Sequence, residues 1–198
     1  TDNLGTISTK TIEIKVNSSS NCAADFVEKN GLVVAEIESV PLATGWQKKT
    51  DAAGYTGSSY YAWAGGNQLN SPGKGLLEYK IQINTPGTYR FQWRSKVGIG
   101  NNSTEHNDSW LKIPDADDFY GQKGSNTVRP KGVCTNDCPK GSSKDGWFKI
   151  YSSGSTNWTW STRTSDHDAH DIYARFDKAG IYTIKISGRS DGHFLDRF

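Results

Sequence analysis

The feature that most constrains the fold is a succession of short segments in which apolar and polar residues alternate. Examples are "LVVAEIESV", "LLEYKIQI", "GTYRFQWRSKV", "GWFKIYSS", "DIYARF" and "GIYTIKISGRS". A period of two is typical of a half-buried β-strand, and β-branched and aromatic residues favour that conformation. Clusters of Gly, Pro, Asn, Asp and Ser separate the segments, as expected for turns. The pattern predicts an all-β fold, and this number of short strands predicts a β-sandwich.

The composition of the chain limits its partners. Of its 198 residues, 34% are hydrophobic but 12% are aromatic, with seven Trp, so we expect a modest core and aromatic rings to spare. A formal net charge of +2 gives no strong attraction to nucleic acid. No run approaches the roughly 20 apolar residues that span a bilayer, so we expect no membrane partner either.

The first 30 residues differ from the rest of the chain. "TKTIEIKV" has the alternation of a strand, and "NSSSN" after it has the composition of a linker. Because a lone strand is not stable in water, we expect residues 1–30 to be the tail of an upstream immunoglobulin-like domain and its linker. The main domain would then be 31–198. The alternative is that this strand is an edge strand of the main domain.

Two of the three cysteines lie in one loop. Cys134 and Cys138 are four residues apart in "VCTNDCPKG". A zinc site needs about four ligands, and no matching cysteine pair exists, so we expect a small disulfide rather than two reduced thiols. Such a bond would place the protein outside the cytosol, secreted or at the cell surface. Cys22 has no assigned partner.

Two long loops interrupt the strand pattern, residues 98–108 and 114–145. Loops of this length are usually functional in compact domains. The second loop is basic, and its cationic residues could meet the sulfate or carboxylate groups of an anionic polysaccharide. A solubilising loop is the alternative. These residues are Lys123, Arg129, Lys131, Lys140 and Lys144.

Four stretches, in order, carry a resemblance to a known family. They are "AEIESV", "AGYTGSSYYAW", "LLEYKIQINTPGTYRFQWR" and "ARFDKAGIYTIKISGRSDGHFLDRF". Together they resemble the β-jelly-roll carbohydrate-binding modules of the family 6, 35 and 36 type. The resemblance covers residues 33–198 apart from 114–145. It implies a non-catalytic module of a secreted bacterial enzyme that degrades polysaccharides.

A calcium site is expected at the start of the domain. Glu36 and Glu38 are two residues apart on a predicted strand, so both carboxylates point to one face. This arrangement is unfavourable unless a cation or an Arg intervenes, and Ca²⁺ prefers such hard oxygen ligands. The resemblance implies a structural Ca²⁺ held by Glu36, Glu38 and Asp196. The alternative is an exposed polar face.

Trp158 is the candidate for stacking on a sugar ring. Trp158 and Trp160 are two residues apart in "NWTWST", so both face one way if the segment is extended. In the related modules a Trp of this loop stacks on sugar, but the spacing to the next Trp there is three. We expect Trp158, which is nearer the "GSTN" turn, to be the exposed ring, although core packing is the commoner role of a Trp.

Polar residues are expected to surround that ring. In the related architecture the loop 98–108 lies beside the "SGRSDGH" turn, so six residues should converge near Trp158 and hydrogen-bond sugar hydroxyls. These are His106, Asn107, Asp108, Arg189, Asp191 and His193. In "SDHDAHD", Asp166 and His170 would form the rim; the stretch is too acidic for zinc, and a second Ca²⁺ stays open.

The sequence favours a binding module over an enzyme. A glycosidase needs two carboxylates, one of them with a raised pKa in an apolar pocket, whereas the paired carboxylates here lie on the predicted calcium strand or in polar loops. We therefore expect a non-catalytic polysaccharide-binding domain that targets an attached catalytic domain to its substrate. A polysaccharide lyase using His170, Tyr173 and Arg175 stays open, as does a cell-surface adhesion domain.

Overall fold

The computed structural model describes residues 24–198. The strand and linker predicted before residue 24, together with Cys22, lie outside the described residues. β1 (Phe26–Val27) pairs in parallel with β4 (Leu77–Ile83). The division of the chain at residue 31 stays a prediction.

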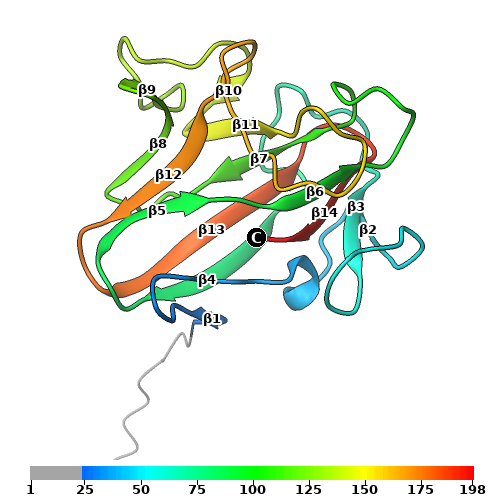
Figure 1. Cartoon of the computed structure of the whole chain (residues 1–198), viewed down its shortest axis with the longest axis horizontal. Helices are drawn as coiled ribbons and strands as arrows, with labels where there is room; N and C mark the ends of the chain where they lie inside the picture. Colours follow the sequence, from blue (N-terminus) through cyan, green and yellow to red (C-terminus); the bar gives the residue numbers. More distant parts are fainter. Residues whose placement is uncertain (1–23) are drawn as a thin grey trace, which may run out of the picture.

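The predicted all-β sandwich is confirmed (Figure 1). One layer is a six-stranded sheet in the order β1, β4, β13 (Gly180–Gly188), β7 (Asp108–Lys112), β11 (Trp147–Tyr151) and β10 (Ser143–Lys144). A four-stranded sheet holds β5 (Gly87–Phe91), β12 (Asp171–Phe176), β8 (Asp118–Lys123) and β9 (Asn126–Val128). Another holds β2 (Trp46–Lys49), β3 (Tyr60–Trp63), β14 (His193–Arg197) and β6 (Arg94–Val97). Residues 24–198 contain a single short helix, the 3₁₀ turn η1 (Ile37–Ser39), and no helix in this part of the chain could cross a membrane.

The core lies between the layers and follows the alternation of the sequence. In β4 every second residue is buried, beginning with Leu77, and in β12 the buried positions are Ile172, Ala174 and Phe176. Ile172 lies opposite Phe91 of β5. Each large apolar side chain that is buried contributes about 1.5–3 kcal/mol. A shift of one residue would turn these side chains toward water, so the pattern of buried positions fixes the register of the strands.

The strands β5 and β6 follow one another along residues 87–97, and a later segment runs beside them. Thr159 pairs with Ser95, the hydroxyl of Thr162 bonds the backbone of Trp93, and β12 pairs with β5. Residues 163–170 loop out between these contacts. Because Ser95 is fully buried and neighbouring side chains alternate, Trp158 and Trp160 point to the outside of the layer.

Five of the seven tryptophans are buried, which is more than the composition suggested: Trp46, Trp63, Trp93, Trp110 and Trp147. Trp110 lies on the outer face of the six-stranded sheet and is covered by a loop, because its indole N–H donates to the carbonyl of Gln68 at 2.9 Å. Loops thus bury rings that alternation alone would leave in water. Only Trp158 and Trp160 remain accessible among the tryptophans of the described chain.

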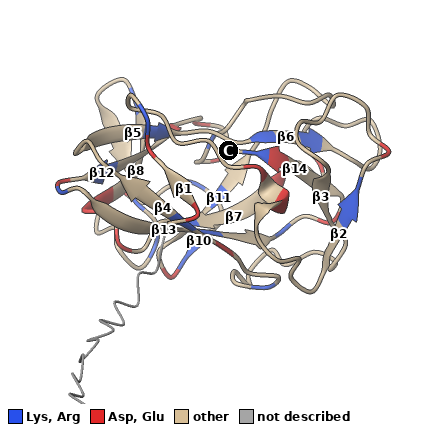
Figure 2. Cartoon of the chain, turned by 90° about the horizontal axis from the view of Figure 1, so that it is seen from below, with Lys and Arg blue, Asp and Glu red and all other residues tan. Residues whose placement is uncertain are grey.

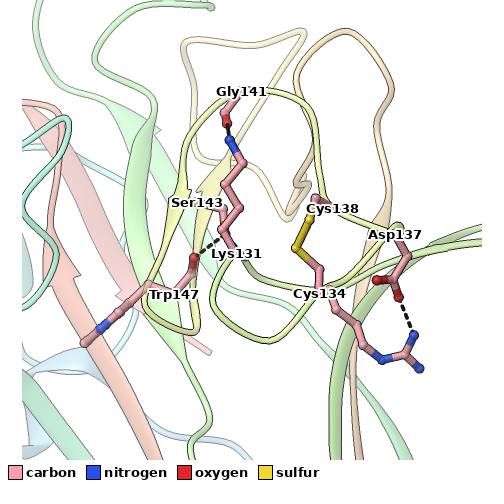
Figure 3. The surroundings of a disulfide bond; sticks show 8 residues. Lys131, Cys134, Asp137, Cys138, Gly141, Ser143 and Trp147 are labelled. Atoms are coloured by element: carbon pink, nitrogen blue, oxygen red, sulfur yellow. Dashed lines mark hydrogen bonds and ion pairs between the residues drawn. A yellow bond between two sulfur atoms is a disulfide. The ribbon is translucent and has the colours of Figure 1, made fainter.

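The prediction of one long loop at 114–145 is wrong, because this basic segment contains β8, β9 and β10. The turns between these strands are tied down in several places (Figure 3). The predicted disulfide is present, with the Cα atoms of Cys134 and Cys138 5.2 Å apart. Arg129 binds Asp118 and Asp137 at 2.7 and 2.6 Å, which raises the pKa of its guanidinium, Asp118 contributing most. A disulfide persists in an oxidising compartment, consistent with a location outside the cytosol.

Candidate functional site

Trp158 is held in place on the outer face of the small sheet that contains β6. Its indole N–H donates to the carbonyl of Ala53 at 3.1 Å, and its ring meets Tyr60 edge-on with centroids 5.3 Å apart. The guanidinium of Arg94 lies 5.3 Å from the ring centroid, a cation–π contact. Trp158 is therefore partly exposed and rigid, with part of its surface used for packing.

Trp160 has the larger exposed area, at 43% of the residue. It stands at a groove of about 930 Å³ that opens beside β5. Residues 31–34 line the groove as well, with Leu32 and Val34 exposed, and buried side chains such as Ile81 form its apolar lining. An aromatic ring beside an apolar groove is a typical setting for a ligand.

Polar groups on β6 and on the residues just before it border the two rings. The side-chain amide of Gln92 donates to the carbonyl of Trp160 at 3.4 Å, and the ammonium of Lys96 donates to the carbonyl of Thr156 at 2.9 Å. Arg197 lines the same groove as Trp160. Figure 2 shows blue, cationic stretches of β6 beside a red, acidic stretch of β14. Amide, ammonium and guanidinium groups therefore lie in the neighbourhood of the two rings.

The predicted calcium ligands Glu36 and Asp196 share one partner. The hydroxyl of Thr56 lies 2.9 Å from Glu36 and 3.0 Å from Asp196. Arg197 binds Glu36, and Arg94 binds Asp196 at 2.6 Å. Because Arg94 also lies over the Trp158 ring, Asp196 is connected to that ring through Arg94.

The third predicted calcium ligand, Glu38, reaches the same loop. One oxygen accepts the backbone N–H of Ser58 at 2.7 Å, and its other oxygen, Oε2, is buried without a hydrogen-bond partner. Among residues 24–198 no group of three or more His, Cys, Asp or Glu is already arranged as a metal site.

The six polar residues predicted to surround Trp158 do lie near one another. His106 Nδ1 is 2.5 Å from the carbonyl of Asp191, and the Ser109 hydroxyl is 2.8 Å from His193 Nδ1. Asp108 binds Arg189 at 2.6 Å. Four of the six are buried, namely Asn107, Asp108, Arg189 and His193. Asp108 and Arg189 bind each other, whereas Asn107 donates to the carbonyl of Ser152 and His193 bonds Ser109. Trp158 itself contacts Tyr60, Arg94 and Ala53.

Asp166 and His170 have different surroundings. Asp166 accepts from the ammonium of Lys149 at 2.7 Å, and Lys149 lies 4.0 Å from Asp108, so Asp166 is connected to Asp108 through Lys149. His170 is fully buried, and its Nδ1 is 2.5 Å from the carbonyl of Asp168. In this position His170 cannot touch a ligand on the surface.

His193 predicts a pH dependence of stability. Burial lowers the pKa of His193 to about 4, opposed by the charge of Asp108. In the unfolded chain the pKa of His is near 6.5. The contribution of neutral His193 to the free energy of unfolding is therefore fully present above pH 6.5, and about 3 kcal/mol is lost as the pH falls toward 4. Urea unfolding at pH 4 to 8 checks this. The His193→Asn variant should lose stability less steeply over that range, and equal slopes for the two proteins would contradict the assignment.

The fold defines this chain as a member of the all-β sandwich class, and the comparisons with known proteins add little to that. No family model matches the chain, and no curated protein matches it. One similar solved structure is a cycloisomaltooligosaccharide glucanotransferase from Paenibacillus sp. complexed with cycloisomaltoheptaose, with a TM-score of 0.45 and 19% sequence identity. The match covers 88% of this chain and 19% of that chain. A similarity at this level assigns neither a ligand nor an activity to this protein.

The sequence did not indicate that Trp160, Arg94 and Gln92 belong to the candidate site. The signal for Trp160 was present, since a spacing of two places both tryptophans on one side. Its exposure depends on the groove beside β5, which is formed by residues far apart in the sequence. The positions of Arg94 and Gln92 follow from the pairing of Ser95 with Thr159, which no local pattern indicates.

Proposed function

We propose that the domain binds a polysaccharide without cleaving it, on the surface formed by Trp158, Trp160 and the adjoining groove. The observation that carries this proposal is the distribution of the tryptophans. Five are buried, whereas Trp158 and Trp160 point outward from one short segment, next to cationic and amide donors. Exposed aromatic rings cost free energy in water, and a ligand that covers them offsets that cost.

The chemistry of this surface matches a sugar chain. A pyranose presents apolar C–H faces, which suit the electron-rich face of an indole, and hydroxyl groups at its edge, which suit amide and guanidinium donors. Trp158 is fixed by its N–H bond to Ala53. A ring that is already fixed loses little conformational entropy when it binds, which favours affinity.

The surroundings of the carboxylates support a binding role. No Asp or Glu is among the residues that line the groove in the described part of the chain. Glu36 and Asp196 are each paired with an Arg and neither lines the groove, whereas a glycosidase places both of its carboxyl groups beside the bound sugar. The burial of His170 also disfavours the alternative of a lyase that uses it as a base.

The proposed role is to target an attached, secreted catalytic domain to its substrate. An open site of this kind binds weakly on its own, but a physical link to an enzyme raises the effective concentration at the substrate. The disulfide supports an extracellular location. An adhesion domain that binds protein is the competing function, and it predicts no response to glycans.

Affinity electrophoresis with a panel of soluble neutral and acidic polysaccharides tests the proposal. We expect retardation by at least one member of the panel and no new reducing ends or unsaturated uronate in the same samples. Products that accumulate with the wild type would show an enzyme. Unchanged mobility on the whole panel would leave the proposal without support.

The same proposal includes a structural Ca²⁺ held by Glu36, Glu38 and Asp196. The donor chemistry fits, since two of these carboxylates share the Thr56 hydroxyl and the buried Oε2 of Glu38 lacks a partner. A bound Ca²⁺ would supply positive charge that joins the first segment of the domain to its last strand. At a hundredfold excess over its Kd it would stabilise the fold by about 2.7 kcal/mol.

Thermal unfolding with Ca²⁺ and with EDTA checks this. We expect Ca²⁺ to raise Tm by several degrees in the wild type and in Glu78→Gln, a control on β4 whose carboxylate pairs with Lys80 and Lys185. Glu38→Gln should lose the shift. If millimolar Ca²⁺ leaves the Tm of the wild type unchanged, no calcium site exists here.

A further inference from the structure

The outer face of the β5-β12-β8-β9 sheet carries a second aromatic surface. Tyr173 of β12 lies opposite Arg90 of β5 on one side and opposite Tyr120 of β8 on the other. The rings of Tyr120 and Tyr173 are stacked, with centroids 5.6 Å apart and planes 20° apart, and both residues are partly exposed. The two stacked rings form an apolar platform in an otherwise polar face, and the guanidinium of Arg129 lies 5.9 Å from the centroid of the Tyr120 ring.

A polar hollow of about 490 Å³ adjoins this platform. Side chains from three parts of the chain line it: the end of β8, the loop before β12, and β12 itself. They include Gln122, Lys123, Arg163, Asp171 and Tyr173. Hydrogen-bond donors of the amide, ammonium, guanidinium and phenol types therefore surround one small space.

The charges around the hollow are not balanced. Asp171 is shared by Arg90, at 2.9 Å, and by Arg163. Asp168 is shared by Lys123 at 2.7 Å and Lys140 at 3.8 Å, and the bond from Lys123 holds the pKa of Asp168 below its usual value. Four cationic groups share two carboxylates here, so this cluster carries a net charge of +2. The positive charge and the hydrogen-bond donors around the hollow favour the binding of an anion.

We propose that this face is a second saccharide site, whose hollow takes a sulfate ester on a polysaccharide while the neighbouring sugar rings lie on Tyr173 and Tyr120. Donors that approach from three separate segments suit a tetrahedral oxyanion better than a planar carboxylate. A sulfate ester is also the anion of a strong acid, so it stays ionised at neutral and mildly acidic pH. The inference rests on the proposed function only for the class of ligand, because its residues are distinct from Trp158 and Trp160.

Isothermal titration of the whole chain with dextran sulfate, and with neutral dextran of equal length, tests the site. The variant Lys123→Gln/Arg163→Gln should bind dextran sulfate at least about tenfold more weakly, because two charge-assisted contacts are lost. Lys48→Gln/Lys178→Gln removes the same charge from two exposed positions away from the hollow and should change Kd less than about twofold. Lys123→Gln alone, an exposed position, gives the test if the double variant folds poorly.

The outcomes separate this site from the first one. Equal weakening in both double variants would show that only net charge matters, and unchanged binding in the Lys123 variants would place the ligand elsewhere; either result overturns the inference. Polygalacturonate that binds the hollow as tightly as dextran sulfate would overturn the choice of sulfate. In a Trp160→Ala background, Lys123→Gln/Arg163→Gln should still weaken dextran sulfate binding by the same factor, so a failure of the proposed function at the tryptophans is seen independently.

Discussion

Replacing Trp160 with Ala is expected to weaken polysaccharide binding about thirtyfold while leaving the fold intact. The side chain is 43% exposed and borders the groove, so its removal takes away a stacking surface without opening a hole in the core. Loss of the buried area and of the stacking contact is worth about 2 kcal/mol in binding. Affinity electrophoresis or titration calorimetry with the best polysaccharide of the panel measures the change.

A matched control separates stacking from general loss of surface hydrophobicity. Ile181→Ala removes another large apolar side chain, 42% exposed, from β13 in the opposite layer. Its affinity should equal that of the wild type. Wild-type affinity in Trp160→Ala, or an equal loss in Ile181→Ala, would contradict the assigned surface. Trp158→Ala should weaken binding and also stability, because that ring packs against Tyr60.

Replacing Asp108 with Ala is expected to lower the free energy of unfolding by about 3–5 kcal/mol. Asp108 binds Arg189 and accepts the hydroxyl of Ser190, both at 2.6 Å, and all three residues are buried. Without the carboxylate, the guanidinium of Arg189 would be a buried charge without its partner, which is strongly unfavourable. Urea unfolding at pH 7 measures the loss.

The exposed pair of Arg175 and Asp177 supplies the control. Asp177→Ala should change the free energy of unfolding by less than about 1 kcal/mol, since water screens this pair. Asp108→Ala should also keep its affinity for polysaccharide when measured on folded protein. A stable Asp108→Ala protein that no longer binds ligand would instead place Asp108 in the binding surface.

The fold could be predicted from the sequence because its strands alternate clearly. In "LLEYKIQI" the residues expected to face inward, from Leu77 to Ile83, are the buried ones. The role of Trp110 could not be predicted in the same way. It sits on the outer face of its sheet and is buried only because the chain around Gln68 folds over it, a contact between segments about forty residues apart.

The candidate site was predictable only in part. The spacing of Trp158 and Trp160 indicated that both side chains point to the same side of the segment. That side is the outer one, because Thr159 between them pairs with the buried Ser95. The relative exposure of the two rings depends on Tyr60 and Ala53, which lie far away in the sequence. The same limit applies to Asp108: a polar side chain in a loop can bind a ligand or join a buried network, and only its burial distinguishes the two.

The central claim is that a polysaccharide covers Trp158 and Trp160 and no other tryptophan. The most direct test follows the indole N–H signals of the seven tryptophans by NMR while a polysaccharide that binds is titrated in. The signals of Trp158 and Trp160 should shift together with one Kd, while those of the five buried rings stay in place. Saturable binding that leaves both of these signals unmoved would contradict the claim.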